Sequence, residues 1–196
     1  NASLTGGDST GAKFIGADLT DANMSRRDIS GADLNNSILT NTILNGTRFS
    51  SSTIWPSGFD YLNSGAFGPG VDFRALDLSS FDANNPNHVD LRNANFEGVV
   101  LNGKRMRANF ENSNFRNASL TGGDSTGAKF IGADLVGANL TGRNISGATF
   151  IGAIYSSSTQ WPAGFDPVAA GAILVPTPSP PLTDANFTTA INLWFS

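Results

Sequence analysis

The chain has 196 residues, a formal net charge of −4 and no cysteine. The lack of cysteine excludes disulfides, thiolate catalysis and cysteine-based metal sites. The mild acidic balance argues against a nucleic-acid or anionic-membrane surface, since either needs clustered lysine and arginine. The longest apolar stretch, residues 168–175, is far shorter than the roughly 18 residues of a membrane span, so we expect no membrane insertion.

From the first residues onward the chain is organised in units of five. A small residue usually fills the first position of a unit and a large apolar residue the third. A period of five matches neither a helix nor a strand, but it suits a chain that turns a corner every five residues. The large residues of the first units are Leu4, Phe14, Leu19, Met24, Ile29, Leu34, Leu39, Leu44, Phe49 and Ile54.

These A-[DN]-[LF]-x-x units resemble the pentapeptide-repeat family. The resemblance implies an all-β fold, a right-handed quadrilateral parallel β-helix with four units in each coil. The first and third residues of a unit would point inward and the other three outward. Stacking at about 20 residues would then give three inner columns: Leu4, Met24 and Leu44; Phe14, Leu34 and Ile54; and Leu19 with Leu39.

The units predict two repeat domains followed by a tail. The first domain, residues 1–70, ends in a WPSGFD terminator loop, and the second, residues 71–175, ends in the similar WPAGFDP. Residues 1–19 and 117–135 are identical. Residues 176–196 predict a Pro-rich linker, and a short amphipathic helix after residue 183 that begins a truncated further domain.

The tail has a resemblance of its own. Its string LTDANFTTAINLWFS resembles the start of BspA-like leucine-rich repeat domains, which belong to bacterial surface proteins. The predicted helix would place Phe187, Ala190, Ile191, Trp194 and Phe195 on one face.

Candidate catalytic residues are scarce. His88 is the only histidine, and it lies in an irregular stretch between units. No Ser–His or His–metal constellation can be assembled around it. We therefore predict that the chain is not an enzyme and has no catalytic, cofactor-binding or metal-binding residues.

Aspartate recurs at the second, outward position of the units. A paired-carboxylate or calcium site is one interpretation, and capping of the corners is the other. Asp8 and Asp28 would share a face with Arg48, and Asp33 would share one with Lys13 and Thr53, which dilutes the negative charge. We therefore favour capping for the recurring residues Asp8, Asp18, Asp28, Asp33, Asp124 and Asp134.

Two polar substitutions occur at matching places in both domains. Arg27 and Arg143 occupy an inward position that normally holds a small residue, and Ser9 and Ser125 replace the large central residue. Because an unpaired guanidinium cannot be buried, we expect each arginine to open the corner or swing outward. Each serine hydroxyl should bond a backbone group inside its column.

The terminators contain clustered aromatic residues, Trp55, Phe59, Trp161 and Phe165. Such clusters can bind sugars or peptides. A cap over the open end of a β-coil is the stronger interpretation, because that end exposes unpaired backbone and apolar side chains.

These observations favour a non-catalytic structural or protein-interaction solenoid, a module of a larger bacterial surface or secreted protein at an extracellular or cell-surface location. The alternative is a cytoplasmic, DNA-mimicking pentapeptide-repeat protein that binds a type II topoisomerase. That role needs a sustained acidic face, which is interrupted by Lys13, Arg48, Arg105 and Arg107.

The protein partner is not identified by the sequence, and no nucleic acid is expected. Because Asn1 falls inside a repeat, we expect the true N-terminus to lie upstream. An uncapped first coil would favour self-association, since it offers unpaired backbone groups beside apolar side chains.

Overall fold

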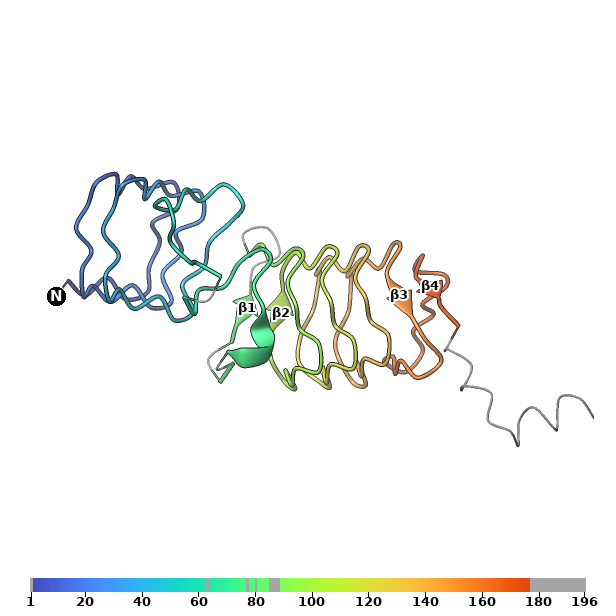
Figure 1. Ribbon diagram of the computed structural model, residues 1–196. Helices are drawn as coiled ribbons and strands as arrows, with labels where there is room; N and C mark the ends of the chain where they lie inside the picture. The colour runs from blue at the N-terminus through green and yellow to red at the C-terminus, as the bar shows by residue number, and fades with distance from the viewer. Residues whose placement is uncertain (1, 63, 77, 80, 85–88, 177–196) are drawn as a thin grey trace, which may run out of the picture.

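The computed structural model describes residues 2–62, 64–76, 78–79, 81–84 and 89–176. Both His88 and the helix expected after residue 183 lie outside these ranges. The described chain forms two stacks of coils, one in each half (Figure 1). The elements are η1 (Phe73–Ala75), β1 (Ala83–Asn84), β2 (Met106–Arg107), β3 (Ile154–Tyr155) and β4 (Ile173–Leu174). The described residues contain no helix long and apolar enough to cross a bilayer.

Each coil pairs in parallel with the next through its backbone. Pairs β1–β2 and β3–β4 are the longest ladders, and isolated parallel bridges link the other coils at spacings near 20 residues. Asn23 is typical, because its N–H donates to Ala2 O at 2.9 Å while its carbonyl accepts from Leu4 N at 2.7 Å. The expected all-β fold of parallel stacked coils is therefore confirmed.

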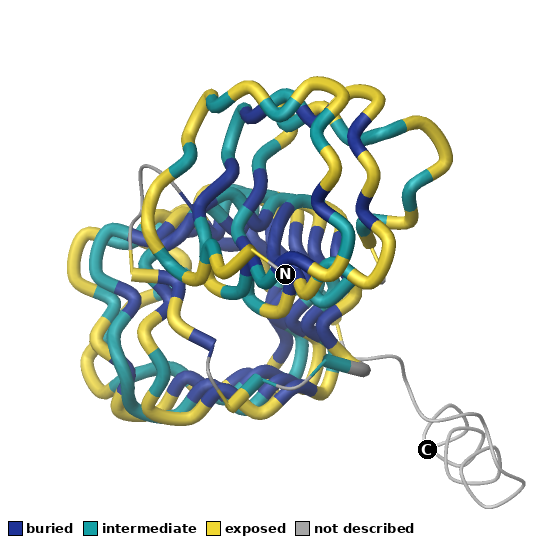
Figure 2. Tube along the Cα trace, turned by 90° about the vertical axis from the view of Figure 1, so that its left-hand side faces the viewer, coloured by how far each residue is buried: buried dark blue, intermediate teal, exposed yellow. Residues whose placement is uncertain are grey.

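The inner columns follow the five-residue units. Asp18 bridges Ile38, which stacks Leu19 on Leu39, and these two side chains are only 7% and 9% exposed. Seen along the stack, buried and exposed positions alternate along each coil, and the buried positions of successive coils lie behind one another (Figure 2). Burying one such leucine contributes about 1.5–3 kcal/mol, so stability accumulates with each added coil.

Corners require a left-handed backbone at the fifth position of a unit. Glycine adopts this conformation without steric cost, as at Gly16 with φ of 67°, and asparagine tolerates it, as at Asn36 with φ of 57°. This explains why the fifth position is so often glycine, asparagine or aspartate.

Ile54 is not in an inner column, so that assignment was wrong. Its side chain is 51% exposed, and its backbone bridges Asp33 at an outward position. The preceding corner holds one extra residue, because Thr53 N–H donates to Ser50 O at 3.0 Å and thereby shifts the register by one. Trp55 consequently takes the inner place.

The same insertion changes one outer face. Ile54 lies beside Asp33 and Lys13, where Thr53 had been expected. Thr53 instead occupies the small inward position and donates its hydroxyl to Ile29 O at 3.0 Å. An equivalent insertion precedes Trp161, since Thr159 N–H donates to Ser156 O at 3.0 Å.

The second stack has a core of phenylalanine ladders. One ladder contains Phe73, Phe96 and Phe115, with ring centroids 4.2 and 4.7 Å apart. The other contains Phe110, Phe130 and Phe150, with centroids 5.1 and 5.2 Å apart. All six side chains are fully buried. Offset stacking of this kind adds about 0.5–1.5 kcal/mol per pair beyond the burial of area.

The aromatic terminators pack onto the core. In the first, the Trp55 ring stacks between Phe59 and Tyr61, with centroids 5.3 and 5.5 Å away. In the second, Trp161 packs on Phe165 at 5.0 Å. Both tryptophans are partly buried against the hydrophobic core, which is the arrangement that a cap requires.

Candidate functional site

The outward aspartates and asparagines cap the corners of the coils. A side-chain Oδ1 at the second position accepts the backbone N–H two residues further on, as Asp8 does from Thr10 at 2.7 Å and Asp134 from Val136 at 3.0 Å. The bond recurs at Asp18, Asn23, Asp28, Asp33, Asp72, Asp90, Asn95, Asn109, Asn114, Asp124, Asn139 and Asn144. These carboxylates therefore have a structural task.

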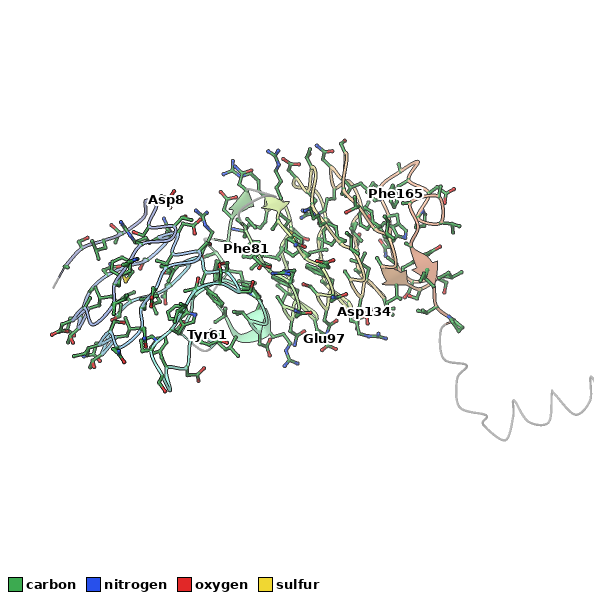
Figure 3. All side chains as sticks on the ribbon, turned by 90° about the horizontal axis from the view of Figure 1, so that it is seen from above. Asp8, Tyr61, Phe81, Glu97, Asp134 and Phe165 are labelled. Atoms are coloured by element: carbon green, nitrogen blue, oxygen red, sulfur yellow. The ribbon has the colours of Figure 1, made fainter. Side chains whose placement is uncertain are left out.

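Arginines form ion pairs with some of the acidic side chains on the surface. Figure 3 shows Glu97 and Asp134 among the outward side chains of the second stack. The ion pairs are Asp28–Arg48 at 3.3 Å, Asp72–Arg74 at 2.6 Å, Asp90–Arg92 at 2.8 Å, Asp82–Arg105 at 2.7 Å, Asp134–Arg116 at 2.5 Å and Glu97–Arg74 at 3.7 Å. Within the described ranges no three metal-ligating side chains gather.

The corner bonds also perturb acidity. Hydrogen bonds from the side chain and backbone of Thr126 hold the pKa of Asp124 below its usual 3.8, and the charges of Arg107 and Arg143 act in the same direction. Such a carboxylate stays ionised at neutral pH, because the bonds favour the charged form.

A charged side chain lies inside the second stack. Arg143 is 2% exposed. Its guanidinium donates to Leu120 O at 2.5 Å, to Ser125 Oγ at 2.9 Å, to Leu101 O at 3.1 Å and to Lys104 O at 3.3 Å. Burial lowers the pKa of Arg143 to about 10, which still leaves the group charged at neutral pH.

Arg27 makes the matching contacts in the first stack. Its Nε donates to Ser9 Oγ at 2.6 Å, and its Nη1 donates to Leu4 O at 2.9 Å and Gly6 O at 2.8 Å. Of the two expected accommodations, the outward swing was wrong, because backbone carbonyls inside the coil solvate the guanidinium. The corner is open instead, since Leu4 O and Leu120 O accept from the arginine and not from a corner amide. The serine hydroxyls bond these arginines rather than the backbone groups that had been expected.

Two sequence features create the arginine niche. A serine in place of a leucine leaves room in the column, and an arginine 18 residues later fills it, as in the pairs Ser9–Arg27 and Ser125–Arg143. The Gly-Gly corner matters as well. A Cβ added at Gly123 would lie 2.4 Å from Lys104 O, so only glycine allows the two backbone segments to lie this close together.

The hydrogen bond from Arg143 to the carbonyl of Leu120 follows a pattern that recurs in the solenoid. At several other places, a threonine or serine at the small inward position donates to the carbonyl of the large residue in the coil before, whereas the buried Ser37 hydroxyl makes no such bond. Examples are Thr47 Oγ1 to Met24 O at 2.9 Å and Ser113 Oγ to Leu91 O at 2.7 Å. Arg143 donates to Leu120 O in the same way. The sequence signal missed was the constant spacing between the serine and the arginine.

One groove of about 670 Å³ opens on the first stack. Its lining includes the polar residues Thr5, Ser25 and Asn45 and the apolar residues Phe67 and Leu76. Arg26 is the one ionisable side chain among its described lining residues. A general acid–base pair needs two such groups within hydrogen-bond reach, and the described lining supplies one.

Stacked coils with inner ladders and capped corners define a β-solenoid repeat protein. A family model described as Pentapeptide repeats, in eight copies, matches residues 1–26, 21–55, 87–124, 108–147 and 126–154. The chain therefore belongs to the pentapeptide-repeat family, whose fold is a right-handed quadrilateral β-helix. The BspA-like resemblance of the tail has no support from these matches. No curated protein matches the chain.

Solved structures of this family are similar to the chain. The pentapeptide repeat protein alr5209 from Nostoc PCC 7120 is 30% identical, with 53% of this chain and 84% of that chain covered and a TM-score of 0.33. HetL from Nostoc sp. strain PCC 7120, a protein involved in heterocyst differentiation regulation, is 26% identical over 75% and 61% of the two chains, with a TM-score of 0.30. QnrB1, a plasmid-mediated fluoroquinolone resistance protein, is 15% identical over 99% and 88%, with a TM-score of 0.33.

Proposed function

We propose that this chain is a non-catalytic protein-interaction solenoid and a module of a larger bacterial surface or secreted protein that acts outside the cell. Pentapeptide-repeat proteins are generally structural or interaction proteins. The proposal is carried by the way the chain uses its polar groups. The inward-pointing ones hold the coils together, and the outward faces remain for recognition.

The inward groups are committed to the fold. The guanidinium of Arg143 bonds three carbonyls and a hydroxyl, and the buried hydroxyls of Thr47 and Ser113 bond carbonyls of the preceding coil. A buried charge that is hydrogen-bonded to the carbonyls of two coils and to one hydroxyl stabilises one register of coils. A contact surface benefits from such rigidity, because little ordering entropy is lost on binding.

The outward faces are polar, with single exposed isoleucine side chains among the polar ones. In the first stack, Ile15, Ile38, Ile43 and Ile54 are 47–54% exposed. They stand among short hydroxyl and amide side chains, whose acidic neighbours are partly neutralised by arginine. A mixture of apolar anchors and polar rim is typical of protein–protein contacts.

The DNA-mimicking alternative needs an unbroken acidic stripe. In this chain the column of Asp8 and Asp28 ends at Arg48, which pairs with Asp28, and Asp134 pairs with Arg116. Phosphates of duplex DNA carry a charge at regular short intervals along the axis. Interrupted columns match that pattern poorly, which favours the interaction module.

Cell-surface exposure is the direct test. Antibodies raised against residues 2–176 should label intact bacteria that express the full-length protein, and protease added outside the cells should remove the epitope while a cytosolic marker survives. As a second arm, the purified chain should leave DNA supercoiling by a type II topoisomerase unchanged at micromolar concentration. Protection from external protease together with inhibition of supercoiling would overturn the proposal in favour of the alternative.

A further inference from the structure

The groove on the first stack crosses several coils. Its described lining takes Thr5, Ser25 and Asn45 from three successive coils and Gly65 from the segment that follows them. These segments are joined by backbone hydrogen bonds, such as Arg26 N–H to Asn45 O at 3.1 Å. Each coil adds about 4.8 Å, so this row measures roughly 14 Å, the length of about four extended residues.

Apolar lining comes from residues 65–76, which lead from the first stack into the second (Figure 1). Phe67 is buried and bridges Arg48 through its backbone, and Leu76 is half-buried against the hydrophobic core. Both side chains also line the groove. The groove therefore combines a row of short polar side chains with an apolar patch.

Arg26 supplies the charge of the groove. Its side chain is exposed, and among the described residues no ion pair or side-chain hydrogen bond engages its guanidinium. The described lining also contains no carboxylate. Arg26 thus differs from the arginines that pair with acidic side chains on the surface, which are Arg48, Arg74, Arg92, Arg105 and Arg116.

The backbone at Arg26 is unusual for an arginine. It has a φ of 59°, in the left-handed region, whereas the other described non-glycine residues with positive φ are asparagines and one aspartate. The corresponding corner of the second copy is Gly142, with a φ of 68°. A long side chain disfavours this conformation, which short polar side chains tolerate. Arginine therefore occupies this corner against the local backbone preference, and such conflicts concentrate at functional sites.

We propose that the groove around Arg26 binds an extended segment of a protein partner in which a carboxylate lies next to an apolar side chain. The guanidinium pairs with the carboxylate, because its fork of N–H donors matches two carboxylate oxygens. The apolar side chain contacts Phe67 and Leu76, since neighbouring side chains of an extended segment point to opposite sides. This inference rests on the proposed interaction role and specifies the chemistry of the partner at one site.

An acidic protein segment suits the groove better than other anions. A free inorganic anion would engage Arg26 but leave the apolar lining exposed to water. A nucleic acid carries phosphates at regular short intervals and needs a row of cations, whereas the described lining holds one. A segment with alternating acidic and apolar residues covers both parts of the lining.

Peptide binding to the purified chain tests the proposal. One blocked peptide alternates leucine and aspartate, and its control has asparagine in place of aspartate. Dissociation constants are measured from chemical-shift changes at the amides of Ser25, Asn45 and Phe67. The aspartate peptide should bind at least about tenfold more tightly, as expected for a hydrogen-bonded charge pair. Arg26→Asn should abolish this preference, whereas Arg116→Asn, which removes the same charge from the second stack, should keep it.

Thermal melting separates recognition from a structural role of Arg26. Asparagine occupies five other left-handed corners among the described residues, so Arg26→Asn should melt no lower than the unchanged chain. A lower melting temperature would overturn the proposal, because the arginine would then serve the fold.

The binding data have outcomes of their own that would overturn the proposal. These are no binding of the aspartate peptide at millimolar concentration, equal affinity for the two peptides, or equal affinity of the unchanged chain and Arg26→Asn for the aspartate peptide. Inorganic phosphate that alone reproduced the shifts would also overturn it, since the groove would then bind a free anion. Failure here would leave the cell-surface test of the proposed function unaffected, and failure of that test would leave the peptide result standing.

Discussion

Replacing Arg143 with alanine tests the interior of the solenoid most sharply. Arg143 is the only described donor to Leu120 O, so Arg143→Ala leaves a buried carbonyl unpaired and a gap beside Ser125. An unsatisfied buried acceptor costs about 1–3 kcal/mol, and the vacated volume adds to this. The mutation also removes a charge whose burial is unfavourable, as the lowered pKa of this arginine indicates, and this offsets part of the cost. We therefore expect the free energy of unfolding to fall by about 2–4 kcal/mol.

The chain provides a matched control. Arg27 occupies the equivalent niche, although its neighbours are Arg26 and Asp28 where Arg143 has Gly142 and Asn144. It is partly exposed, and within the described residues its printed bonds go to Ser9, Leu4 and Gly6. Water can replace its bonds, so Arg27→Ala should cost only about 1 kcal/mol.

Urea unfolding at pH 7 measures both variants. Trp55 reports on the first stack and Trp161 on the second, since each packs on its own terminator. Equal losses for Arg143→Ala and Arg27→Ala, or a loss below about 1 kcal/mol at Arg143, would refute the argument that buried carbonyls depend on the guanidinium.

Three other predictions test separate parts of the account. Leu34→Asp should unfold the first stack, because Leu34 is 0% exposed, whereas the exposed Asn35→Asp should be nearly silent; equal shifts in melting temperature would contradict the inward and outward assignment. Gly123→Ala should lower the free energy of unfolding by about 3 kcal/mol or more, since the added Cβ would lie 2.4 Å from a backbone atom. At Gly142 an added Cβ would have no atom within 4 Å, so Gly142→Ala should lower it by only about 1–2 kcal/mol, through the strain of the left-handed backbone. Thermal melting measures both. The pKa of Asp124 is lower in the folded state than its usual 3.8, so the ionised carboxylate stabilises the fold above pH 3.8 and this stabilisation is lost as the pH falls through the pKa of the folded state. Asp124→Asn should therefore make the free energy of unfolding less dependent on pH below 3.8. An unchanged slope of free energy against pH would disprove this.

The regular part of the fold could be predicted from the sequence because its signal is local. Each unit repeats the same small and large inward residues, so the stacking of Leu19 on Leu39 follows from counting. The outward aspartates were also predictable as corner caps, since a short carboxylate at that place can accept from the backbone two residues on.

The exceptions required the structure. Counting by fives placed Ile54 inside, and the sequence could not reveal the extra corner residue because Ile54 and Trp55 are both apolar. Arg143 can stay inside the coil because it bonds carbonyls of residues 23 to 42 positions earlier in the chain. Contacts across two coils are set by three-dimensional stacking, and no single unit contains them.

Engineered cysteine pairs give the most direct test of the coil geometry. Val100 bridges Ser119 in the neighbouring coil, so their Cα atoms should lie about 4.8 Å apart, within the range of a disulfide. The variant Val100→Cys with Ser119→Cys should therefore oxidise readily to an intramolecular disulfide in the folded state. Asn114 is nearer to Val100 in sequence but bridges Asn95 on another face, so Val100→Cys with Asn114→Cys should stay reduced. Faster oxidation of the second pair than of the first would contradict the stacked-coil account.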